Sequence, residues 1–243
     1  MRKIFKLNFS YFVHGKMDIK TRNKLNVISR WKKLQYNEQE YIECTGKHYQ
    51  HLKARILGYL AGDGNIYIGK TSKNRHHSIR FFPDHSSLLK PYCEAFSKVY
   101  NKTPIIKPLS NKYCVTVDSK IVVLNMTSSA SFGLFNWEVP IIFLKDKRSK
   151  KEWLRAFFDA EAYVGKNHIK IQTVNEKGMG QMKRLLEEFG IESKKYVYIP
   201  KNIKWSPNHI IFINKKSSRY KYFKEIGFSH ILKQKKLIQA LNL

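Results

Sequence analysis

The chain has 243 residues, of which 42% are apolar and 14% aromatic, which is enough to build a folded core and argues against general disorder. It carries 46 Lys and Arg against 18 Asp and Glu, a formal net charge of +28. An excess of this size favours a polyanionic partner, nucleic acid above all, with a ribosomal-type structural protein or a basic bias of the whole source proteome as the alternatives. The longest apolar runs, such as residues 139–144, are far shorter than the roughly 18 residues of a membrane helix, so no membrane role is expected.

The three cysteines show neither a paired framework nor the Cys and His spacing of a zinc site. The apolar stretch near the N-terminus is interrupted by Lys6, Asn8 and His14, unlike that of a secretory signal. We therefore expect a reduced compartment, either cytoplasmic (nucleoid-associated) or organellar, and not a secreted protein.

Residues 1–50 form an extension with no counterpart elsewhere in the chain, and a helix is predicted at 18–34. Either a small DNA-binding helix pair or packing against the main body would suit this segment.

Residues 56–69 follow, reading ILGYLAGDGNIYIG, a helical apolar run that contains Gly58 and Gly62 and has its first acidic residue at Asp63. Each glycine costs about 1 kcal/mol relative to alanine inside a helix. We therefore expect that the helix face without side chains at these two positions has a structural role.

The remainder of the first half is predicted to contain a strand at 78–82, a helix at 86–101, a strand at 113–118 and a helix at 121–126. The basic residues 145–151 are predicted to link it to a second motif helix that begins near residue 150. The second half then shows a strand at 168–174, a helix at 178–190, strands at 195–199 and 209–214, and a helix at 217–226.

The two halves repeat each other. Residues 56–70 and 154–166 each show a small-residue helix face, an acid, and then Tyr, a β-branched residue, Gly and Lys. The acids Asp63 and Glu161 are 98 positions apart, which indicates an internal duplication. We predict an α+β fold of two pseudo-symmetric units, 51–144 and 152–243, each reading helix, two strands, helix, two strands, helix.

Small residues spaced four apart lie on one helix face, so each half has its own strip, formed by Gly58 and Gly62 in the first and by Ala156 and Ala160 in the second. Two helices packed through these strips would approach closely and bring the two acids together at their C-terminal ends. Carboxylates placed there repel each other unless a cation lies between them. An all-oxygen site favours Mg²⁺ or Mn²⁺ over zinc, and in a basic protein such a site favours phosphodiester hydrolysis.

A Gly-Asp-Gly sequence alone is an ordinary turn signal, and a ligand role is favoured because the same small-residue face and terminal acid recur in the second half. With both copies in view, the chain resembles the LAGLIDADG homing endonucleases in their single-chain, two-motif form, the archaeal intron-encoded type. The nine motif positions fall on residues 56–64 (ILGYLAGDG) and 154–162 (LRAFFDAEA), and the resemblance spans roughly residues 50–243. It implies two αββαββα units with saddle-shaped antiparallel sheets over the DNA major groove and the motif helices at the interface.

The resemblance implies catalytic and metal-binding roles for Asp63 and Glu161, with the backbone carbonyls of Gly62 and Ala160 completing a shell for two or more Mg²⁺ or Mn²⁺ ions. The family places a polar residue about twenty positions after the first acid, where this chain has Asp84 instead of a neutral amide. It also places a lysine in the pocket, for which Lys233 is the candidate and Lys166 the alternative.

The two copies depart from the motif in different ways. Ala61 replaces its first Asp in the first copy, at a non-catalytic position. Ala162 replaces the closing glycine of the second copy, where alanine would disfavour a helix end with positive φ.

DNA contacts are expected from outward-facing strand residues and charged loops, with Arg and Gln able to read base edges and most lysines holding phosphates. The candidates are Lys70, Lys73, Arg75, Arg80, Lys107, Lys112, Lys170, Gln172, Lys195, Lys201 and Lys204.

By this resemblance the protein is a monomeric, intron-encoded enzyme that cuts both strands of a long, nearly asymmetric DNA target across the minor groove and leaves 3′ overhangs. The alternatives are an RNA maturase that assists splicing of intron RNA, or a DNA-binding protein on the same fold that does not cut.

Overall fold

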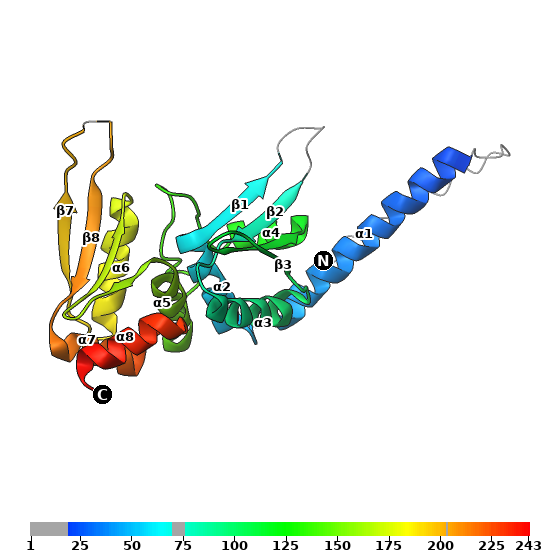
Figure 1. The fold of residues 1–243 in the computed structure, drawn as a ribbon. Helices are drawn as coiled ribbons and strands as arrows, with labels where there is room; N and C mark the ends of the chain where they lie inside the picture. The colour runs from blue at the N-terminus through cyan, green and yellow to red at the C-terminus, as the bar shows by residue number, and fades with distance from the viewer. Residues whose placement is uncertain (1–18, 70–75, 203) are drawn as a thin grey trace.

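The computed structural model describes residues 19–69, 76–202 and 204–243, and it consists of two similar units joined at a central pair of helices (Figure 1). The first unit contains α2 (Gln50–Asp63), β1 (Gly64–Ile68), β2 (His77–Phe81), the 3-10 turn η1 (Ser86–Leu88), α3 (Leu89–Tyr100), β3 (Ile105–Pro108), β4 (Tyr113–Asp118) and α4 (Lys120–Thr127). The second contains α5 (Lys147–Glu161), β5 (Tyr163–Val164), β6 (Ile169–Thr173), α6 (Glu176–Glu188), β7 (Lys194–Tyr198), β8 (Asn208–Ile213), α7 (Lys216–Glu225) and α8 (Ile231–Leu241).

The two sheets have the same topology. Their strand orders are β1-β2-β4-β3 and β5-β6-β8-β7, and every pairing is antiparallel. In each unit a long helix leads into the first strand, and a second helix separates the first strand pair from the second. The predicted α+β fold with a duplicated αββαββα unit is therefore confirmed.

Alternation along the central strands explains how each sheet packs. On β6, Ile169 and Ile171 are buried while Gln172 is exposed, and on β8 Ile211 and Ile213 are buried. A strand with one apolar face packs that face on helices and leaves the other open. The core on the covered face continues into the central helices, where Trp153 and Phe157 of α5 stack at 5.3 Å between ring centroids.

Most predicted elements agree with the observed ones to within a few residues, but α1 continues to Thr45, well beyond the predicted end at residue 34. The side chain of Asp146 accepts a hydrogen bond from Ser149 N at 2.8 Å and caps α5, so this helix begins at Lys147 and includes most of the expected linker 145–151. The sequence pattern gave no residue range for the strands β1, β3 and β5 or for the final helix α8.

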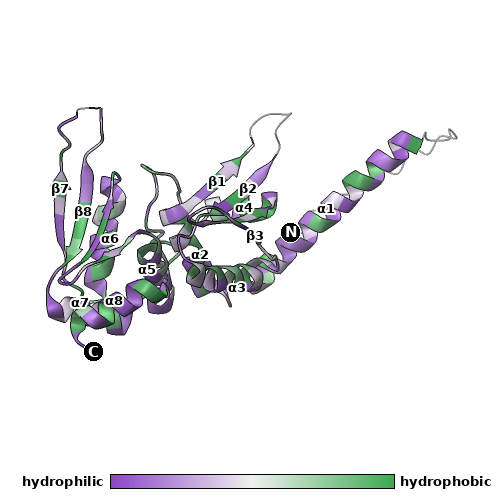
Figure 2. Cartoon of the chain, in the orientation of Figure 1, coloured by the Kyte–Doolittle hydropathy of each residue, from purple (hydrophilic) through white to green (hydrophobic). Residues whose placement is uncertain are grey.

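Helix α1 (Ile19–Thr45) projects from the first unit, and its C-terminal part is anchored there (Figure 1). Tyr41 donates a hydrogen bond to the Lys98 carbonyl at 2.9 Å, and Glu38 accepts one from Ser119 at 2.6 Å. Residues 19–34 are exposed throughout, and Figure 2 shows hydrophobic positions scattered along them among hydrophilic ones. Within the described part of the extension, the C-terminal end of α1 packs against the body. Among the described residues, no helix is both long and apolar enough to cross a membrane.

Candidate active site

The close approach of α2 and α5 depends on small side chains. A Cβ added at Gly58 would lie 2.4 Å from the Trp153 carbonyl oxygen and 3.0 Å from Ala156 Cβ, and one added at Gly62 would lie 2.7 Å from Ala160 Cβ. Cβ atoms do not approach other atoms below 3.0 Å, so both glycines are required by proximity. The four strip residues therefore lie in one helix–helix contact.

Polar contacts flank this seam. Arg55 of α2 pairs with Glu152 of α5 at 2.7 Å, and Tyr59 of α2 donates a hydrogen bond to Asp159 of α5 at 3.1 Å. Because both contacts join the same two helices, they fix the register in which the glycine strip meets the alanine strip.

Asp63 and Glu161 are the last residues of α2 and α5, and the seam brings them to the same end of the helix pair. Glu161 Cγ would lie 3.2 Å from a Cβ at Gly62, the residue before Asp63. Burial, followed by repulsion from Asp63, raises the pKa of Glu161 to about 7. Burial and the nearby charge of Asp84 raise the pKa of Asp63 as well. Burial and neighbouring negative charge therefore make it unfavourable for both acids to be ionised at the same time.

These shifts predict a pH-dependent stability that divalent ions should change. The folded-state pKa of Glu161 lies above its usual value of 4.5, so its contribution to stability is complete below that pH and is lost as the pH rises through about 7. The loss is on the order of 3 kcal/mol. We expect the thermal unfolding midpoint in EDTA to fall from pH 5 to pH 8, and Mg²⁺ to restore it at pH 8 but not at pH 5.

Glu161→Gln is the matched variant for this measurement, because it removes the titrating group and keeps the side-chain volume. Its midpoint should depend less on both pH and Mg²⁺. A variant profile that follows the wild type in both respects would show that another group causes the dependence.

The donor set fits a hard divalent cation. Two buried carboxylates with raised pKa values and the adjacent helix-end carbonyls supply oxygen ligands of the kind that Mg²⁺ and Mn²⁺ prefer. The Ala160 carbonyl already accepts a hydrogen bond from Lys233 Nζ at 2.9 Å, so a metal ion there would have to share this oxygen with the ammonium group.

Of the two candidate pocket lysines, Lys233 lies beside the acids. Its ammonium donates hydrogen bonds to the carbonyls of Asp159 and Ala160, at 2.5 and 2.9 Å. Burial lowers its pKa, and the charges of Asp84, Asp159, Asp63 and Glu161 oppose that shift. Lys166 instead lies in the β5–β6 connection, where its carbonyl accepts a hydrogen bond from Arg219, and it lines a separate cavity with Lys236 and Gln239. The geometry favours Lys233 over Lys166.

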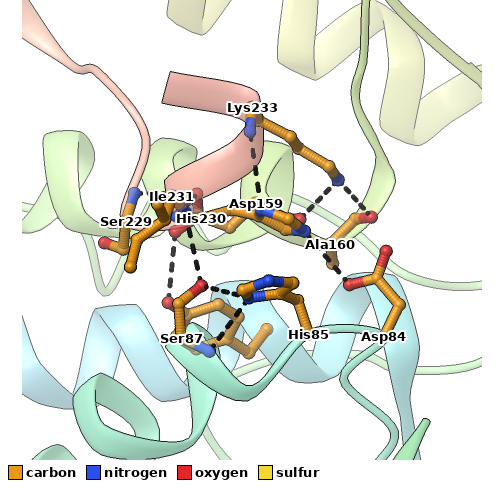
Figure 3. A network of polar contacts seen from close by, with 10 residues as sticks. Asp84, His85, Ser87, Asp159, Ala160, Ser229, His230, Ile231 and Lys233 are labelled. Atoms are coloured by element: carbon orange, nitrogen blue, oxygen red, sulfur yellow. Dashed lines mark hydrogen bonds and ion pairs between the residues drawn. The ribbon is translucent and has the colours of Figure 1, made fainter. Parts of the chain in front are cut away.

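Asp159 was not predicted to matter, yet it is fully buried and accepts several hydrogen bonds (Figure 3). Its Oδ1 accepts from the backbone nitrogens of Ser229 and His230, and its Oδ2 accepts from Tyr59. Burial raises the pKa of Asp159 to about 6 against the lowering effect of these bonds. The one available clue in the sequence was an acid inside an otherwise apolar helix face.

Alanine at position 162 does not disfavour the end of the second motif helix. Gly64 has φ −107° and Ala162 has φ −78°, so neither helix end needs the left-handed conformation. Gly64 is required for another reason, since a Cβ there would lie 2.3 Å from Leu60 Cα.

The open faces of the two sheets carry half of the predicted DNA-binding residues that the structure describes. Arg80 pairs with Thr116 and Lys107 with Cys114 in the first sheet, and Lys170 pairs with Phe212 in the second. Gln172 is exposed on the same face as Lys170 and lines the 360 Å³ cavity that also contains Glu161. Positive and amide groups thus extend from the site onto both sheets.

The prediction for Lys195 is wrong. It pairs with the buried Ile211, and its ammonium lies 3.3 Å from Glu176 of α6, so it points to the helix-covered face. Its neighbour Lys194 pairs with Phe212 and takes the open-face position instead. Exposed Lys112, Lys201 and Lys204 lie in strand connections, and Lys70, Lys73 and Arg75 lie outside the described residues.

Residues 149–227 match the family model of the LAGLIDADG-like domain. The second unit therefore contains a LAGLIDADG-like domain. Its fold resembles structures of the homing endonuclease I-DmoI: mesophilic variants of that enzyme match with a TM-score of 0.58 at 17% identity, over 73% of this chain and 90% of the other. I-DmoI in complex with DNA and Mn matches with a TM-score of 0.58 at 16% identity, over 73% and 97% of the two chains. At these identities the likeness shows the fold.

Curated relatives include two archaeal proteins with unrelated names. A glutamine–fructose-6-phosphate aminotransferase of Methanocaldococcus jannaschii is 26% identical over 77% of this chain, and a replication factor C small subunit of Thermococcus kodakarensis is 27% identical over 78%. The matched parts are 17% and 21% of those proteins, so this chain spans about a fifth of their lengths. An uncharacterised protein of M. jannaschii is 24% identical over 99% of this chain and 91% of its own length.

Proposed function

We propose that this chain is a metal-dependent, site-specific double-strand DNA endonuclease of the homing type. The observation that carries the proposal is the meeting of Asp63 and Glu161 at the ends of two tightly packed helices, where burial and mutual repulsion raise the pKa of Glu161 to about 7. Two carboxylates held close together despite this repulsion form a binding site for divalent cations, which can act on a phosphodiester. The net charge of +28 favours binding of the nucleic acid that contains it.

In this proposal Asp63 and Glu161 hold Mg²⁺ or Mn²⁺, which when bound activates water and stabilises the leaving oxygen of a phosphodiester. The protein groups around it have their own tasks. Arg80, Lys107, Lys170, Lys194 and Gln172 on the open sheet faces bind the duplex on either side of the site, and Lys233 brings a positive charge to the end of α5. Because both acids belong to one chain, we propose that the enzyme acts as a monomer.

Two findings from the relatives support this function. The I-DmoI structures were solved with DNA and Mn, with target DNA and Mg, and with DNA and Ca, which supports DNA and a divalent ion as the partners here. A segment similar to this chain also forms a small part of two proteins whose names denote unrelated activities. Because these segments are translated as part of the host proteins, they are in-frame insertions, and this distribution supports a mobile element. We propose that this chain is also encoded by a mobile element, and its intron-encoded origin stays a prediction.

Selection of cleaved sites from a randomised duplex library tests this function. With Mg²⁺ we expect enrichment of one long, nearly asymmetric sequence whose cut ends carry 3′ overhangs, and no enrichment in EDTA. Binding to the library without cutting, at any divalent ion concentration, would contradict the endonuclease proposal and favour a binding or RNA-directed role on the same fold.

A further inference from the structure

His230 lies where the C-terminal segment passes between the two units, and it is almost fully buried, with 3% of its surface exposed (Figure 3). It is the N-cap residue of α8, and its Nδ1 accepts a hydrogen bond from Lys233 N at 3.5 Å. An imidazole nitrogen that accepts carries no hydrogen, so in the neutral ring the hydrogen is on Nε2. That nitrogen lies 3.4 Å from Oδ1 of Asp84 in the first unit.

Both units hold the residues around His230. The backbone nitrogens of Ser229 and His230 donate to Asp159 Oδ1 at 2.9 and 3.0 Å, which ties the segment to α5. Ile231 N donates to Ser87 Oγ at 3.3 Å, which ties the first residue of α8 to the first unit. The start of α8 is therefore fixed from two sides.

The ring of His85 adds a packing contact to this arrangement. It lies against the His230 ring with 4.8 Å between centroids and an interplanar angle of 33°. Its own Nδ1 accepts from Ser87 N at 3.1 Å, so His85 is itself held in place. The His230 ring is consequently restrained on its face as well as at both nitrogens.

The position of Lys233 follows from this restraint. Lys233 is in the first turn of α8, and its ammonium donates to the carbonyls of Asp159 and Ala160 beside Glu161. A rotation of that turn would move the ammonium away from the end of α5. Asp84 itself is 57% exposed at the side chain and reaches this turn through His230.

We propose that Asp84 is a positioning residue: through His230 it holds the first turn of α8 and thereby places the ammonium of Lys233 at the end of α5. The alternative, a third metal-binding carboxylate, is less well supported. Within the described ranges, no group of three or more His, Cys, Asp and Glu side chains is arranged to hold one ion. The proposal rests on the proposed endonuclease function for its cleavage readout only.

Three variants separate these two roles in the full chain. Asp84→Asn keeps an oxygen that can accept from His230 Nε2, so its maximal cleavage rate should fall less than about tenfold. Asp84→Ala removes the acceptor, and His230→Asn keeps an N-cap oxygen for α8 but loses the contact with Asp84. Each of the last two should reduce the maximal rate by about 10²-fold, the effect expected of a misplaced active-site group.

The Mg²⁺ concentration that gives half the maximal rate should stay within about twofold of the wild type in all three variants, and the double variant Asp84→Ala with His230→Asn should be no worse than either single one. A metal ligand would behave differently. If Asp84→Asn is as impaired as Asp84→Ala and both need at least tenfold more Mg²⁺, Asp84 binds metal and the proposal is wrong. Full activity of Asp84→Ala would also overturn it.

The tautomer of His230 gives a readout that does not depend on cleavage. In the ¹⁵N spectrum of the labelled full chain, we expect His230 with hydrogen on Nε2, and loss of this preference in Asp84→Ala. Hydrogen on Nδ1 in the wild type would refute the arrangement even if the chain cuts DNA, whereas the expected tautomer in a chain that does not cut would refute the endonuclease function alone. Thermal unfolding confirms that each variant is folded.

A second Asp–His pair in the same chain serves as the control. His76 Nε2 lies 3.7 Å from Asp118 Oδ2 at the end of β4, outside the candidate site. Asp118→Ala should leave the cleavage rate and the His230 tautomer unchanged. A loss of rate equal to that of Asp84→Ala would show that the effect is not specific to the His230 contact.

Discussion

Replacing Asp63 with Asn is expected to reduce the rate of DNA cleavage by roughly 10³-fold or more, because metal stabilisation of the reacting phosphate is worth several kcal/mol. The change keeps the side-chain volume at the end of α2 and removes the negative charge that a divalent ion requires. It also removes the repulsion that raises the pKa of Glu161, which should then titrate at lower pH. DNA affinity measured in Ca²⁺ should stay within a few fold of the wild type, since the open sheet faces are unchanged.

A surface carboxylate provides the control for this variant. Glu94 of α3 is exposed and lies 3.8 Å from Lys90 on the same helix. Glu94→Gln removes the same charge outside the site and should cut at the native rate. If Asp63→Asn also cuts at the native rate, the two motif acids are not the catalytic pair, whatever the fold.

The second large effect concerns the seam between α2 and α5. Gly58→Ala places a Cβ 2.4 Å from a backbone oxygen of Trp153, which cannot move without shifting α5. Overpacking costs about 1 to 3 kcal/mol, and we expect the upper part of this range because the contact is with a backbone atom. This cost outweighs the gain of about 1 kcal/mol in helix propensity. At about 2 to 4 °C per kcal/mol for a chain of this size, the thermal unfolding midpoint should fall by several degrees. Gly58→Val should lower it further.

Gly180 in α6 is the matched glycine, because no heavy atom lies within 4 Å of the Cβ that it would carry. Gly180→Ala should therefore gain about 1 kcal/mol of helix propensity and raise the unfolding midpoint. If Gly58→Ala instead raises the midpoint as Gly180→Ala does, the two central helices are not packed as closely as described.

The sequence predicted those parts of the structure that repeat or alternate. The strip residues recur in both halves, so the packing of Gly58 and Gly62 on α5 could be inferred without coordinates. The alternation of Ile169 and Ile171 with Lys170 and Gln172 gave the open face of β6 correctly. The segment 194–198 (KKYVY) does not alternate between apolar and polar residues in this way. The assignment of Lys195 to the open face was therefore wrong by one residue.

The hydrogen bonds that hold the segment at residues 229–233 beside the two acids could not be predicted, because they join residues far apart in the sequence. Asp159 binds the backbone of Ser229 and His230 about 70 positions later, and Ser87 meets Ile231 at a separation of 144. Neither pair belongs to a periodic pattern. Lys233 was proposed from a basic segment, but only the position of α8 shows why it, and not Lys166, lies beside the acids.

The central claim is that one aspartate and one glutamate from the two units share divalent ions, and anomalous diffraction from crystals of the chain grown with Mn²⁺ and duplex DNA tests it most directly. We expect manganese peaks within bonding distance of both the Asp63 and the Glu161 carboxylates, and none there in Asp63→Asn crystals. Well-ordered carboxylates without manganese between them, or manganese bound only elsewhere in the chain, would contradict the account.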